Sequence, residues 1–154
     1  MTAFWEFSVT RYAWPGVETA ALDLQDRQGF DVNIALWCVW LAAQGRAPGP
    51  ALEKAVEIAH AWTGRITGPV RKLRLRFKGE ADAGPVYKAM LAAELEAERL
   101  LQARLAKLLP ETGVTEAAPR PAAQDGLMAY ATLINKAGDF DAFLSAVFPA
   151  GKTV

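Results

Sequence analysis

The stretch that decides the fold is LDLQDRQGFDVNIALWCVWLAAQG, residues 22–45. Its first half is a polar turn, and its second half is the most apolar helix candidate in the chain. Gly29 suits the position after a helix end, Asp31 suits an N-cap, and Gly45 suits the C′ position of the next helix. Residues 32–44 are apolar on almost every side yet too short to span a bilayer, which predicts a buried central helix. Val, Ile and Trp also favour strands, but the length and the capping residues favour a helix.

Apolar side chains recur at helical spacing through most of the remaining sequence. They predict helices near residues 3–12 (with Thr2 as the cap), 15–28, 50–63, 69–78 and 85–109. The fold class is therefore all-α, a single-domain orthogonal or irregular helical bundle around the central helix. We expect residues 1–109 to form this bundle. Residues 110–124, rich in Pro and Ala, are expected to be a flexible linker, and residues 125–149 a short C-terminal helical pair that packs on the bundle or on a partner.

Composition narrows the classes of function. The 154 residues include 17 Lys and Arg, 17 Asp and Glu, one Cys and one His. The formal net charge is therefore zero, which gives no indication of a nucleic-acid or membrane partner, and a single cysteine cannot form an internal disulfide. The chain lacks the His and Cys ligands of a zinc site, the Glu-x-x-His pairs of a ferritin-like site, and the Gly-x-Ser-x-Gly motif. We therefore assign no catalytic residue, no metal ligand and no cofactor, and an enzyme is the least favoured class.

A stripe of polar and aromatic residues runs along the central helix at helical spacing. It consists of Asn33, Trp37, Trp40 and Gln44. Buried indole and amide groups need hydrogen-bond partners, and these residues can satisfy one another or nearby backbone within the core. The alternative is that they line a ligand pocket. We favour the core interpretation and keep the stripe as a candidate ligand site.

The acidic turn before the central helix is a second candidate site. It contains Gln25 and Asp26 between Asp23 and Asp31, with Arg27 nearby. Carboxylates this close in sequence could bind a divalent cation or another ligand, but their spacing does not match an EF-hand loop. Asp and Asn are ordinary capping residues, so we favour capping and an Asp–Arg pair that fixes the turn.

A basic segment at residues 65–78 is the third candidate. Its cations could hold the phosphates of a nucleotide or nucleic acid, although the segment lacks a P-loop, an RNP motif and exposed aromatic side chains. The competing interpretation is a solvated face neutralised by the Glu-rich helix that follows. The side chains concerned are Arg65, Arg71, Lys72, Arg74, Arg76 and Lys78.

The runs FWEFSVTRYAWPGV, ALDLQD, GFDVN and LWCVWLAAQG lie between Phe4 and Gly45. With these motifs the chain resembles a proteobacterial family classified as a domain of unknown function. The resemblance is clear over the first third of the chain and extends more weakly to about Leu109. It implies a bacterial, soluble, all-helical protein and carries over no activity.

These observations favour a small helical binding or adaptor protein that acts through protein contacts. The alternative is a phosphate-binding or nucleic-acid-binding module that uses residues 65–78. The N-terminus shows no basic region followed by an apolar run, so a cytoplasmic location is expected, without membrane contact. Another protein is the expected partner, nucleic acid is the alternative partner, and the oligomeric state stays open.

Overall fold

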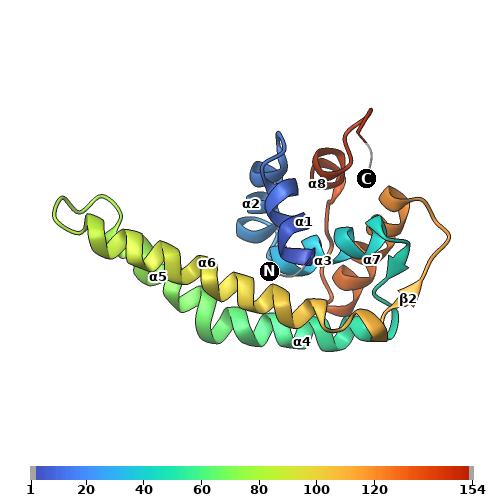
Figure 1. The fold of residues 1–154 in the computed structure, drawn as a ribbon, viewed down its shortest axis with the longest axis horizontal. Helices are drawn as coiled ribbons and strands as arrows, with labels where there is room; N and C mark the ends of the chain where they lie inside the picture. Colours follow the sequence, from blue (N-terminus) through green and yellow to red (C-terminus); the bar gives the residue numbers. More distant parts are fainter. Residues whose placement is uncertain (1–2, 153–154) are drawn as a thin grey trace.

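The structure is a computed structural model that describes residues 3–152, so the expected cap at Thr2 lies outside the described residues. It is a bundle of α-helices with one small two-stranded sheet, and the prediction of an all-α domain is confirmed (Figure 1). None of the described helices has both the length and the hydrophobicity needed to cross a membrane. The elements are α1 (Ala3–Tyr12), α2 (Val17–Asp26), α3 (Val32–Ala43), β1 (Arg46–Ala47), η1 (Gly49–Ala51), α4 (Leu52–Trp62), η2 (Thr63–Thr67), α5 (Gly68–Phe77), α6 (Gly84–Ala106), η3 (Leu109–Glu111), β2 (Gly113–Val114), α7 (Pro119–Leu133) and α8 (Asp141–Val147).

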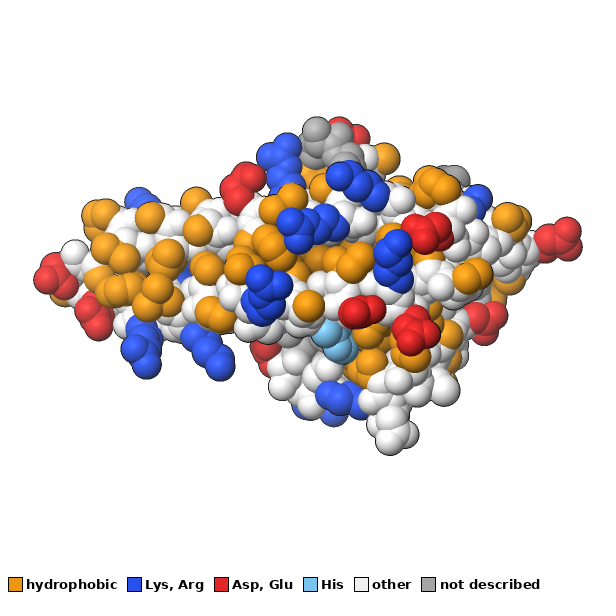
Figure 2. Space-filling view, turned by 90° about the horizontal axis from the view of Figure 1, so that it is seen from below, with side chains coloured by type: hydrophobic (Ala, Val, Ile, Leu, Met, Phe, Trp, Pro, Cys, Tyr) orange, Lys and Arg blue, Asp and Glu red, His pale blue; other side chains and the backbone are white. Residues whose placement is uncertain are grey.

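The most prominent feature is a long helical hairpin that projects from the bundle. One arm runs through α4, η2 and α5, and the other is α6, which packs antiparallel to it (Figure 1). None of the residues of α5 is buried. Seen from below, hydrophobic side chains gather over the free end of this hairpin, at the left of the molecule (Figure 2). The outer half of the hairpin is therefore two helices that no third element covers.

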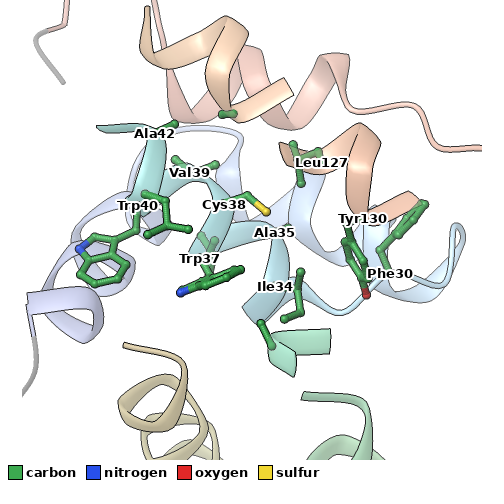
Figure 3. Close-up of a cluster of buried hydrophobic side chains, with 14 of the residues drawn as sticks. Phe30, Ile34, Ala35, Trp37, Cys38, Val39, Trp40, Ala42, Leu127 and Tyr130 are labelled. Atoms are coloured by element: carbon green, nitrogen blue, oxygen red, sulfur yellow. The ribbon is translucent and has the colours of Figure 1, made fainter. Parts of the chain in front are cut away.

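Helix α3 occupies the centre of the bundle, as the sequence predicts. It contacts α1, α2, α4, α6 and α7, and its residues 33–42 are all buried. The Asp31 side chain caps it by accepting a hydrogen bond from the Asn33 amide, and Gly29 and Gly45 both have positive φ. In Figure 3, Trp37, Cys38 and Val39 lie among the other buried side chains of the core.

The chain after α6 differs from the expected flexible linker. Strand β2 pairs antiparallel with β1, and the Arg46 guanidinium donates to Oγ1 and the carbonyl oxygen of Thr112, at 2.7 and 2.9 Å. Helix α7 begins at Pro119, inside the residues assigned to the linker. Proline is favoured in the first turn of a helix, where its missing N–H would have no intrahelical acceptor.

Small residues in the first half of α7 explain the difference. Ala122, Ala123 and Gly126 are buried, and a Cβ at Gly126 would lie 3.5 Å from Cβ of Cys38 on α3. The low content of large apolar residues, interpreted from the sequence as a sign of a linker, instead lets α7 lie close against the central helix. The C-terminal pair, α7 and α8, packs on the bundle.

Candidate functional site

A polar pocket lies at the base of the hairpin, where η2 meets the turn between α2 and α3. Its volume is about 360 Å³. Side chains from α2, α3, α4, η2, α5 and α6 line it, so it is built from segments that are far apart in sequence. The residues are Gln25, Gly29, Phe30, Asp31, Asn33, His60, Thr63, Gly64, Thr67, Arg71 and Glu98.

The wall formed by η2 is a π-helical turn, and the sequence explains why it forms. The Gly68 N–H bonds to the carbonyl of Thr63, five residues earlier, instead of four. Pro69 has no N–H to donate to the carbonyl of Arg65, so a regular α-helix cannot continue there. A Cβ at Gly68 would lie 2.7 Å from the Thr63 carbonyl oxygen, so glycine permits this turn. Single π turns occur frequently at functional sites.

Asp31 ties this turn to the central helix. Its Oδ1 accepts from the Asn33 amide at 2.9 Å, and its Oδ2 accepts from the Thr63 hydroxyl at 2.7 Å. Its own backbone N–H donates to the phenol oxygen of Tyr130 on α7, also at 2.9 Å. The predicted capping role is therefore confirmed, and the same carboxylate also fixes one side of the pocket.

Tyr130 connects the site to His60. The phenol is fully buried, and burial raises its pKa, so it stays protonated at neutral pH. The phenol oxygen accepts from the Asp31 amide and lies 2.9 Å from Nε2 of His60, so a hydrogen bond joins the phenol to the imidazole, and the imidazole tautomer decides which of the two donates. Figure 3 shows Tyr130 beside Phe30, and of the two only Phe30 lines the pocket.

Charged side chains close the pocket on the hairpin side. Arg71 donates from Nε to Glu94 at 2.9 Å and from Nη2 to Glu98 at 3.2 Å. Arg74 binds the other oxygen of Glu94. Burial raises the pKa of the Glu98 carboxyl to about 6 despite the opposing effect of Arg71. The guanidinium of Arg71 is thus already shared by two carboxylates.

One atom of each of two polar side chains in the wall forms no hydrogen bond within residues 3–152. Asn33 is 7% exposed, and its Oδ1 accepts from Nε2 of Gln102 at 2.9 Å while its Nδ2 donates to no described residue. The buried hydroxyl of Thr67 also lacks a hydrogen bond among the described residues. The pocket therefore combines a free amide donor with the carboxylates of Asp31 and Glu98, so a ligand group could form hydrogen bonds in it.

The ligand-site residues predicted from the sequence separate into two groups. Gln25 and Asn33 line the pocket, whereas Trp37 and Trp40 are buried in the core, where Trp40 stacks on Phe4 with ring centroids 5.0 Å apart. The other two predicted ligand-site residues, Asp26 and Gln44, are exposed and belong to neither group. Asp26 accepts a hydrogen bond from Nε2 of Gln25, and Gln44 donates one to the carbonyl of Trp40. The stripe on α3 thus crosses from the pocket into the core because α3 is surrounded by other helices.

The basic residues also divide. Arg71 lines the pocket and Arg74 binds Glu94, as expected for a face neutralised by the Glu-rich helix. The other four side chains are exposed: Arg65, Lys72, Arg76 and Lys78. In the acidic turn, Arg27 Nε donates to Oδ1 of Asp23 at 2.6 Å, which is the expected Asp–Arg pair.

Sequence reasoning did not place Thr63, Thr67, Glu98 and Tyr130 at a site. They come from three different helical segments, and only the Gly64 and Gly68-Pro69 positions signalled that the helix is interrupted there. Cys38, the single cysteine of the chain, is buried, and burial raises its thiol pKa to about 12. Its thiol is therefore not a nucleophile at neutral pH.

Comparison with known proteins identifies a family but no better characterised relative. Neither the curated proteins nor the solved structures contain a significant match. The family described as "Protein of unknown function (DUF2390)" matches residues 3–105, which include most of the pocket-forming segments, and the chain belongs to this family.

Proposed function

We propose that the protein is a binding or adaptor protein that acts through protein contacts, with the α5–α6 hairpin as its contact surface. The observation that carries this proposal is the exposed apolar surface of these two helices. Six of the eleven large apolar side chains that are most exposed within residues 3–152 lie here: Leu73, Leu75, Val86, Leu91, Leu95 and Leu100. Large exposed apolar patches mark interaction sites in soluble proteins, and Figure 2 shows apolar side chains gathered over the free end of the hairpin.

The geometry of the hairpin supports a role in recognition. Its outer half gains no stabilisation from a third layer, so the aliphatic side chains that face away from the α5–α6 contact contribute little to folding. A partner helix laid against α5 and α6 would supply the missing layer by helix-in-groove packing. The polar pocket at the base of the hairpin would add polar contacts that fix the orientation of the partner.

The basic side chains of α5 support the nucleic-acid alternative less well. Arg71 and Arg74 are held by Glu94 and Glu98, so they would have to leave these carboxylates before they could neutralise phosphates. The segment 65–78 then keeps four exposed cations, and the formal net charge of the whole chain is zero. Phosphate binding of this kind depends on concentrated positive charge.

A bacterial cytoplasmic setting belongs to the same proposal. It is supported by the motifs between Phe4 and Gly45, which resemble those of a proteobacterial family. It is also supported by cysteine usage, since the single cysteine is buried and reduced, as is usual for proteins of a reducing compartment.

A pair of charge-introducing variants tests the proposed surface. Leu91 and Met128 are both 46% exposed, but Leu91 lies on the hairpin and Met128 lies on α7. We expect Leu91→Glu to lose a partner protein that co-purifies with the wild type, and Met128→Glu to retain it. Equal retention by both variants, with both folded by circular dichroism, would contradict the assignment of the surface. Light scattering on the same samples distinguishes a second copy of the chain from a different protein.

A further inference from the structure

A second pocket, with a volume of about 230 Å³, is formed by the end of α1, the start of α7 and the segment that follows α8. In the ribbon these segments lie away from the free end of the α5–α6 hairpin (Figure 1). Arg11 and Trp14 line it from the α1 side, Arg120 from α7, and Phe148 and Lys152 from the C-terminal segment. None of the residues that line it is acidic.

Arg11 is the centre of this pocket. The side chain is only 4% exposed, and its Nη1 donates to the carbonyl of Val147 at 2.7 Å. Its guanidinium lies over the rings of Phe7 and Trp14, 4.5 and 4.2 Å from their centroids. A guanidinium has five N–H donors, and Arg11 pairs with no carboxylate within residues 3–152. Buried arginines are normally paired with an anion, because an unpaired buried charge is costly. A bound anion would therefore stabilise the charge of Arg11.

Two more cations converge on the same space. Arg120 donates from Nη2 to the hydroxyl of Ser145 at 3.2 Å, and Nζ of Lys152 lies 4.5 Å from the ring centroid of Trp14. Neither forms an ion pair with a carboxylate among the described residues. Arg120 also sits in the first turn of α7, where the helix dipole adds positive potential. The pocket is thus lined by three cations and by no acidic residue, so a bound anion would be attracted by all three.

The other walls of the pocket are apolar. They consist of Trp14, Val147, Phe148 and three prolines at positions 119, 121 and 149. The volume is below the range of about 300–1,000 Å³ typical of drug-sized ligands. The pocket therefore fits a compact molecule that carries one anionic group and a small apolar body.

We propose that this pocket binds a small organic anion, a carboxylate or a phosphate monoester, through Arg11, Arg120 and Lys152. Arginine binds both groups through paired N–H donors. The apolar body of the ligand would lie against Trp14 and Phe148. The site is separate from the hairpin, so its occupancy does not depend on the protein contacts proposed above.

The test is a titration of the full chain, labelled with ¹⁵N, followed by the indole signal of Trp14, which is assigned with Trp14→Phe. The probes are benzoate, phenyl phosphate and the neutral analogue benzamide. We expect a saturable shift with benzoate or phenyl phosphate and none with benzamide, and comparison of the two anions identifies the preferred acid. No saturation by either anion below about 1 mM, or equal binding of benzamide, would overturn the proposal.

Variants at the exposed cations attribute the binding to this pocket. Arg120→Gln and Lys152→Gln should each weaken binding of the preferred probe about tenfold, because a hydrogen bond to a charged group is lost. Arg99→Gln, which removes a cation from α6 whose side chain is 41% exposed, is the control distant from the pocket and should leave the affinity unchanged. Equal weakening by Arg99→Gln would assign the effect to the general charge of the protein and overturn the site. Arg11 itself is left intact because its burial makes it part of the fold.

Discussion

The hydroxyl of Thr63 donates a 2.7 Å hydrogen bond to Oδ2 of Asp31, and this contact joins the π turn of the hairpin to the N-terminus of the central helix. The other oxygen of the same carboxylate caps α3. Asp31 thus holds the elements on both sides of the polar pocket at a fixed separation. The hairpin is anchored to the bundle at its base, while its outer half is free to contact another molecule.

The π turn can be tested with two neighbouring glycines. A Cβ at Gly68 would lie 2.7 Å from the carbonyl oxygen of Thr63, whereas a Cβ at Gly64 meets no atom within 4 Å. We expect Gly68→Ala to lower the free energy of unfolding by about 1–3 kcal/mol, because the backbone must shift. Gly64→Ala should raise it by about 0.5–1 kcal/mol, since alanine loses less entropy in a helix. Urea denaturation measures both, and stabilisation by both variants would contradict a π turn here.

The ion pairs of Arg71 lead to a second comparison. Arg71→Gln leaves two partly buried carboxylates with less compensation, so we expect a loss of roughly 2–4 kcal/mol, near the range for broken buried pairs. Arg76→Gln changes an exposed side chain and should stay within about 0.5 kcal/mol of the wild type. Similar small effects of the two variants in urea denaturation would mean that Arg71 does not hold the hairpin together.

The same residues predict weak binding of nucleic acid. Because Arg71 and Arg74 are paired with glutamates, labelled single-stranded and double-stranded oligonucleotides should bind weakly at physiological salt. Fluorescence titration at two salt concentrations measures this. A submicromolar complex with a steep salt dependence, lost in the Arg71→Gln/Arg74→Gln variant with the fold intact, would favour the nucleic-acid alternative.

The buried carboxyl of Glu98 should make stability depend on pH. Its pKa in the folded chain is about 6, above the ordinary value of 4.5, so the folded chain binds this proton more tightly than the unfolded chain. The resulting stabilisation is fully present below about pH 4.5 and is lost as the pH rises to about 6. Relative to Glu98→Gln, the wild type should therefore lose up to about 2 kcal/mol between these limits. The measurement is urea denaturation of the wild type and of Glu98→Gln at several pH values. If the difference between their free energies of unfolding is the same at every pH between these limits, the raised pKa is contradicted.

The central helix predicts a large loss of stability on truncation. Trp37 is fully buried on α3, so Trp37→Ala should lower the free energy of unfolding by about 3–5 kcal/mol. Leu73→Ala, at an exposed position of the hairpin, should cost less than about 1 kcal/mol. A loss at Trp37 no larger than the loss at Leu73 would place the indole outside the core.

The sequence predicts the local features of the fold better than its long-range contacts. The apolar run 32–44, the cap at Asp31 and the glycines at 29 and 45 together identify the central helix, because each acts within a few residues. The order of residues 110–124 depends instead on packing of Ala123 and Gly126 against α3, and small residues carry no periodic signal. The same limit applies to the pocket: Gln25 and Asn33 stand out as polar residues near an apolar helix, whereas Glu98 joins them in the lining, and Tyr130 bonds to Asp31 and His60 behind it, only through the tertiary fold.

The most direct test of the proposed function is site-specific photo-crosslinking in cells. A photoreactive benzoylphenylalanine replaces Leu91 on the hairpin or, as the control, Thr132 on the exposed side of α7. We predict a discrete protein adduct at position 91 that is absent at position 132 and is lost when Leu95→Glu is added. Adducts of equal yield at the two positions, or none at position 91 with the fold intact, would contradict a protein-binding hairpin.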